Sequence, residues 1–75
     1  MEVQDLKNKF EELKKRFLEK KYDEVIKECN LILKKNKVDV FYNLLCLSYN
    51  NKNDITKAIN VMELALKDSP NNIDF

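Results

Sequence analysis

The sequence predicts a single all-α domain in which helices are joined by short loops. Of the 75 residues, 44% are hydrophobic, which is enough for a core and too much for a disordered chain. The chain contains no glycine and one proline, whereas the tight turns of a β-fold rely on glycine for positive φ. Large apolar residues recur every three or four positions, the spacing of one helix face. The length fits one domain, residues 1–75.

Two helices are expected in the first half of the chain. The apolar face of the first comprises Val3, Leu6, Phe10, Leu13, Phe17 and Leu18. The apolar face of the second comprises Tyr22, Val25, Ile26, Cys29, Ile32 and Leu33. Lysines at positions 34, 35 and 37 follow this second face, where cations interact favourably with a helix dipole.

Two further helices are expected in the second half. Asp39 is the expected N-cap of the third, because a short acidic side chain can accept backbone N–H groups there. The apolar residues of this third helix are Phe41, Tyr42, Leu44, Leu45, Leu47 and Tyr49. Residues 50–53 predict a turn, since asparagine tolerates the left-handed conformation. Asp54 opens the fourth helix and Pro70 closes it, with Ile55, Ala58, Ile59, Val61, Met62, Ala65 and Leu66 as its apolar residues.

The side-chain inventory argues against catalysis, cofactors and metal binding. There is no histidine, which is the commonest general base and metal ligand. Cys29 and Cys46 stand alone, too few for a zinc site, and we expect both to be reduced structural thiols, a disulfide between them being the less favoured reading. Without glycine there is no phosphate-binding loop. Pairs such as Glu11 and Glu12 fit a solvated helix face. We therefore expect no catalytic residue, no metal and no cofactor.

Charge and hydropathy also limit the classes of partner that the chain is expected to bind. Fourteen basic and 13 acidic residues leave a net charge of +1, unlike the strong basic excess of a nucleic-acid-binding domain. No apolar run approaches the roughly 18–20 residues that cross a bilayer, and the start of the chain carries no signal-peptide core. These features predict a cytoplasmic protein with no nucleic-acid or membrane partner.

The two halves of the chain repeat one pattern. Three apolar residues of the first helix recur 32 positions later: Phe10 at Tyr42, Leu13 at Leu45 and Phe17 at Tyr49. Four positions of the second helix recur 33 positions later: Val25 at Ala58, Cys29 at Met62, Ile32 at Ala65 and Lys37 at Pro70. Such a fixed period indicates two copies of one helical pair.

The pattern resembles the tetratricopeptide repeat (TPR), whose period is about 34 residues. The second copy carries the resemblance in Tyr42-x2-Leu45-Cys46-x2-Tyr49 and Ala58-x3-Met62-x2-Ala65-x4-Pro70. The first copy departs from it at Lys14, Val25 and Ile32, where small residues are usual. The resemblance implies a right-handed helical repeat of four antiparallel helices, with repeat 1 at about 8–37 and repeat 2 at about 39–72. A plain four-helix bundle is the alternative.

The repeat register also predicts a core. The residues expected inside are Phe10, Leu13, Phe17, Cys29, Tyr42, Leu45, Tyr49, Ala58, Met62 and Ala65.

By the same resemblance, the chain is a non-catalytic protein-protein interaction module whose first and third helices line a groove for a peptide or a partner's helix. The expected groove residues are Asn8, Glu11, Lys15, Asn43, Leu44, Leu47, Asn50 and Asn51, with Glu19 and Val40 beside them. One branch of the family binds C-terminal carboxylates through Lys and Asn. The matching positions here hold Glu11, Lys15 and Leu44, so a carboxylate-clamp ligand is not expected.

Two alternatives remain for the function. The fourth helix carries an apolar row that a following helix would cover, which predicts a self-association edge and a possible homodimer; the row is Ile55, Ile59, Met62 and Leu66. The chain can also be the N-terminal scaffold part of a larger TPR-containing protein, because residues 73–75 resemble the opening of another helix.

Overall fold

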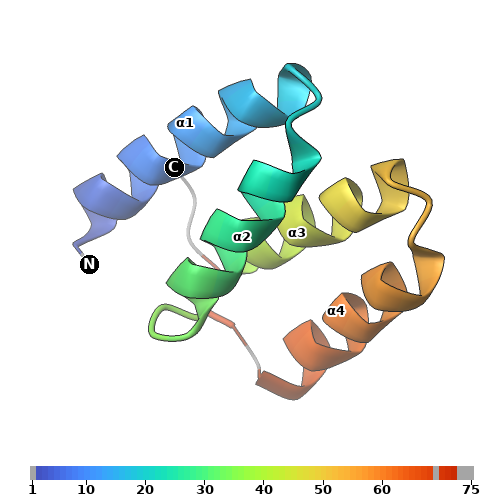
Figure 1. The fold of residues 1–75 in the computed structure, drawn as a ribbon. Helices are drawn as coiled ribbons and strands as arrows, with labels where there is room; N and C mark the ends of the chain where they lie inside the picture. The colour runs from blue at the N-terminus through green and yellow to red at the C-terminus, as the bar shows by residue number, and fades with distance from the viewer. Residues whose placement is uncertain (1, 69, 73–75) are drawn as a thin grey trace.

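The fold consists of four α-helices, as Figure 1 shows for the computed structural model, which describes residues 2–68 and 70–72. The helices are α1 (Val3–Leu18), α2 (Tyr22–Leu33), α3 (Asp39–Asn51) and α4 (Ile55–Asp68). The described residues form no β-strand beyond one isolated bridge. The prediction of an all-α chain with four helices in this order is confirmed. None of the helices in the described ranges is long and apolar enough to cross a membrane.

Two loops contain a residue with positive φ. Lys20 and Asn53 both have φ of 63°, in the left-handed region where a β-carbon is unfavourable and asparagine is better tolerated than most residues. The expected turn at residues 50–53 begins later than predicted, because Asn50 and Asn51 still belong to α3. The backbone N–H of Lys52 donates to the carbonyls of Ser48 and Tyr49 and ends the helix there.

The predicted start of α4 at Asp54 is right, whereas the predicted N-cap of α3 at Asp39 is wrong. Asp54 Oδ1 accepts the backbone N–H of Lys57 at 3.3 Å, as an N-cap does. Asp39, however, is the first residue of α3, and Val38 in extended conformation precedes it. The side chain of Asp39 instead accepts the N–H of Val40 at 2.9 Å. The predicted cap is thus displaced by one residue.

Helix α3 is the centre of the packing. Each helix contacts the next along the chain, and α1 also contacts α3. Among the described helices, α3 therefore contacts all three others, whereas α4 contacts α3 alone. The core cluster draws equally on α2 and α3, with four residues from each, and comprises Leu6, Leu13, Val25, Cys29, Ile32, Leu33, Val38, Phe41, Tyr42, Leu44, Leu45 and Val61.

The predicted core is confirmed in part. Five expected residues are buried: Leu13, Cys29, Tyr42, Leu45 and Ala58. Four more are half-buried against them: Phe10, Phe17, Tyr49 and Ala65. Met62 is exposed over more than half of its surface, so its placement in the core was wrong. The reason is that, within residues 2–68 and 70–72, α3 is the only helical neighbour of α4, and this one helix leaves most of Met62 uncovered.

The segment after α4 is tied back to the start of α3. The N–H of Asp39 donates to the carbonyl of Asn71 at 3.0 Å, and the N–H of Asn71 donates to the carbonyl of Lys37 at 2.8 Å. These bonds form the parallel bridge between Val38 and Asn71.

A side-chain cluster holds the same end of α4. The hydroxyl of Tyr42 donates to Asp68 Oδ2 at 2.6 Å, and Lys37 Nζ donates to the same oxygen at 3.2 Å. Burial, with the hydrogen bond to Asp68, raises the pKa of Tyr42 to about 12. The hydrogen bonds from Tyr42 and Lys37 lower the pKa of Asp68. The carboxylate and the neutral phenol are therefore the forms that this contact favours.

Candidate partner-binding groove

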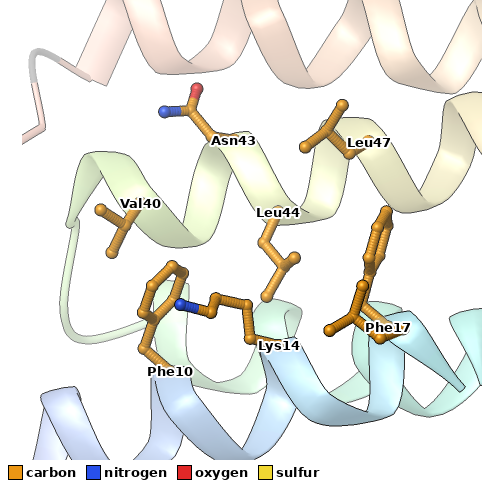
Figure 2. A pocket seen from close by; sticks show the side chains of 8 residues that line it. Phe10, Lys14, Phe17, Val40, Asn43, Leu44 and Leu47 are labelled. Carbon is orange, nitrogen blue, oxygen red and sulfur yellow. The ribbon is translucent and has the colours of Figure 1, made fainter.

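A largely apolar groove runs between α1 and α3 (Figure 2), and we call it the α1–α3 groove. Its volume is about 370 Å³, and four residues of each helix line it. They are Phe10, Lys14, Phe17 and Leu18 from α1, and Val40, Asn43, Leu44 and Leu47 from α3. Six of these eight side chains are apolar.

Helical spacing explains why these side chains meet. The lining residues of each helix recur at intervals of three and four, the positions that share one helix face. Leu44 is only 5% exposed and forms the base of the groove, since it also belongs to the core. Leu47, one turn further along, is 50% exposed and lies at the rim. The groove thus joins a fixed base to an accessible apolar edge.

Aromatic contacts hold the α1 side of the groove in place. The ring of Phe10 packs edge-on against Phe41, with centroids 5.8 Å apart. The ring of Phe17 packs against Tyr22 of α2 at 5.3 Å. Phe41 is fully buried, and edge-to-face pairs of this kind add roughly 0.5–1.5 kcal/mol beyond their buried area. Both rings are therefore held in place by contacts within the chain.

Lys14 is the one charged residue of the lining. Its Nζ atom lies 5.4 Å from the centroid of the Phe10 ring and 3.8 Å from Oε2 of Glu11. The side chain is half exposed, and an exposed ion pair contributes little stability. The ammonium group is accordingly only weakly held by Glu11.

The expected groove residues are distributed differently on the two helices. On α3, Asn43, Leu44 and Leu47 line the groove, as does Val40. Asn50 and Asn51 are exposed at the end of the same helix and do not line it.

On α1, Asn8, Glu11 and Lys15 are exposed outside the lining, as is Glu19 directly after the helix. Four other residues of that helix take their place, because the repeat register assigned Phe10 and Phe17 to the interior and treated Lys14 as a small-residue position. The 10-14-17 spacing on α1 was the signal that could have found them.

A second hollow of about 420 Å³ lies between α3 and α4. It is lined by Tyr42, Asn43, Cys46, Leu47, Val61, Met62 and Ala65. Asn43 and Leu47 therefore form a ridge that borders both hollows. Of the predicted self-association residues, Met62 lines this second hollow, whereas Ile55, Ile59 and Leu66 are exposed elsewhere on α4.

No family model, no curated protein and no solved structure matches the chain. A function for this protein must therefore be argued from its own residues and their geometry.

Proposed function

We propose that the protein is a non-catalytic interaction module whose α1–α3 groove holds a peptide or a helix of a partner protein. The observation that carries this proposal is an open apolar groove with a preformed base at Leu44 and an accessible rim at Leu47. Apolar surface of this kind is stabilised when a partner removes it from water, and contiguous apolar patches on a small protein commonly mark interaction sites.

The resemblance to the tetratricopeptide repeat supports the proposal. In a right-handed repeat of antiparallel helical pairs, α1 and α3 would be the first helices of each pair and would line the concave groove. Contacts between successive helices, together with the contact of α1 with α3, agree with that arrangement. The 32- and 33-residue spacing of the two copies supports it independently.

The lining favours a ligand with an apolar anchor and a neighbouring acidic residue. An apolar side chain fits against Phe10, Phe17 and Leu44, while Lys14 can pair with the carboxylate. Asn43 offers an amide to the ligand backbone. A carboxylate clamp is not proposed, because Leu44 replaces a donor and is buried. Side-chain anchoring is therefore the mode of binding that we propose.

The test places a charge on each side of the groove. Leu18→Glu combined with Leu47→Glu should abolish capture of the wild-type protein's partner in a pull-down, because a carboxylate would have to be desolvated against an apolar ligand. Both leucines are exposed, so circular dichroism should remain helical. Leu31→Glu is the matched control, since Leu31 is an exposed leucine of α2 that does not line the groove.

The decisive comparison is between the two variants. Titration of the captured partner should show binding to the Leu31→Glu protein at wild-type strength and no binding to the groove variant. Equal binding by the groove variant would overturn the proposal and move the site to another surface.

A further inference from the structure

Helix α4 carries an exposed row of large apolar side chains, which we call the α4 row. Ile55 is 51% exposed, Ile59 48%, Met62 57% and Leu66 82%. Their intervals of four, three and four are those of a coiled-coil seam, in which each side chain packs into a hole on a facing helix. The row thus has the spacing of a helix-packing face, but none of the described helices packs on it.

The equivalent face of α2 is covered. Thirty-three residues before the α4 row stand Tyr22, Ile26, Cys29 and Leu33. Cys29 is 0% exposed and Leu33 7%, and the other two are half-buried. Helix α2 contacts both α1 and α3, whereas α4 contacts only α3 among the described helices. The four positions are therefore buried or half-buried on α2, which has a second helical neighbour, and exposed on α4, which has none among the described helices.

We infer that a second copy of this chain covers the α4 row, with the two α4 helices packed antiparallel about a twofold axis. A twofold axis pairs one surface with itself, and this row is suited to that. An axis between Ile59 and Met62 places Ile59 of one copy opposite Met62 of the other. The same axis places Ile55 opposite Leu66. Every large residue of the row then meets an apolar residue.

A head-to-tail contact between α4 and the outer face of α1, away from the groove that Phe10 and Phe17 line, is disfavoured by charge. Exposed residues of α1 include Asp5, Lys7, Glu12 and Lys15. Its two largely exposed apolar residues, Val3 and Leu18, stand at opposite ends of the helix. Placing the α4 row there would desolvate charged groups without apolar contacts in return. The self-pairing of the row avoids this cost.

The area sets the strength of the dimer. Four side chains at these exposures present roughly 400 Å² of apolar surface, within the size of the largest patches on monomers. Stable interfaces bury about 800 Å² per partner, so the row supplies about half and its polar borders must supply the rest. We expect a dimer that dissociates on dilution. The row contributes nothing to the α1–α3 groove, so dimerisation and partner binding can succeed or fail separately.

The experiment is light scattering on size-exclusion peaks over roughly 10 µM to 1 mM protein. The wild type should approach twice the mass of one chain at the upper end. Ile59→Glu with Leu66→Lys should keep the mass of one chain throughout, because charges would face the partner's row. Leu64→Glu is the matched control, since Leu64 is an exposed apolar residue of α4 outside the row. This control should associate like the wild type.

Three outcomes would overturn the inference. A wild type with the mass of one chain at the highest concentration excludes the second copy. If that monomer instead bound a helix of another protein, that helix would be what covers the α4 row. A row variant that still dimerises places the contact elsewhere. If Leu64→Glu lost the dimer to the same extent as the row variant, the loss could not be assigned to the α4 row.

Discussion

At the scale of single residues, the two cysteines lie in different environments. Cys29 is fully buried in the core, and burial, with a smaller contribution from Glu28, raises the pKa of its thiol to about 12. Cys46 is half-buried between α3 and α4, and its Sγ lies 3.5 Å from the carbonyl oxygen of Ala58, to which the thiol donates. The thiols form no disulfide with each other, and the expected core position holds for Cys29, whereas Cys46 is only half-buried.

This difference predicts unequal reactivity. Since the thiolate is the reactive form, Cys29 should resist a thiol reagent in the folded protein even at mildly alkaline pH, whereas Cys46 should react measurably faster. Both should react at one rate in denaturant, which is the control. Mass spectrometry after timed labelling identifies the modified residue. Native labelling of Cys29 as fast as that of Cys46 would contradict its burial.

At the scale of elements, the contact of α4 with α3 depends on small side chains. Ala58 is buried and its carbonyl accepts the Cys46 thiol, while Ala65 is half-buried. Small residues allow two helices to approach closely, because the interaxial distance is set by the side chains at the contact. The only other buried residue of α4 is Val61. A modest apolar area therefore holds this helix.

Replacing Ala58 by leucine should overpack this contact. We expect a loss of roughly 1–3 kcal/mol in the free energy of unfolding, measured by urea denaturation followed by circular dichroism. Asn60→Leu is the control, because residue 60 is exposed on the same helix and gains a similar side chain. An unchanged unfolding midpoint for Ala58→Leu would mean that α3 and α4 do not meet at this residue.

The helices were predictable from the sequence because their apolar residues follow a helical period. Their ends were less so. The N-cap is the last residue before the helical conformation begins. The bridge between Val38 and Asn71 holds Val38 extended, so α3 begins at Asp39. At Asn50 and Asn51, helical hydrogen bonds outweigh the turn preference of asparagine. A tertiary contact therefore shifted the start of α3, and continued helical hydrogen bonding shifted its end.

At the scale of the whole molecule, the sequence predicted one side of the α1–α3 groove better than the other. The α3 side was predicted, since Asn43, Leu44 and Leu47 follow from the repeat register. The α1 side was not, because a side chain such as Phe10 can serve the core and the groove together: it contacts Phe41 and also lines the groove. How much of the Phe10 ring stays accessible depends on the distance between α1 and α3, which the sequence pattern does not give.

The uneven packing of the four helices predicts uneven local stability. Backbone amides exchange with solvent through local opening, which is easiest where few buried contacts hold an element. Helix α3 contacts all three other helices and contributes Phe41, Tyr42, Leu44, Leu45 and Ser48 to the interior. Helix α4 contacts only α3 among the helices that the structure describes. We therefore expect the central amides of α3 to exchange most slowly and those of α4 much faster.

Hydrogen exchange read residue by residue by NMR checks this order, and the Ile59→Glu/Leu66→Lys variant separates packing within one chain from dimerisation. In that variant α4 should exchange quickly at every protein concentration, since α3 is the only described helix that packs against it. In the wild type the α4 amides should slow as concentration rises while those of α1 stay unchanged, because the second copy covers only the α4 row. If the α4 amides of the variant exchange as slowly as those of α3, the prediction is wrong. Packing against α3 would then be enough to protect α4 from local opening.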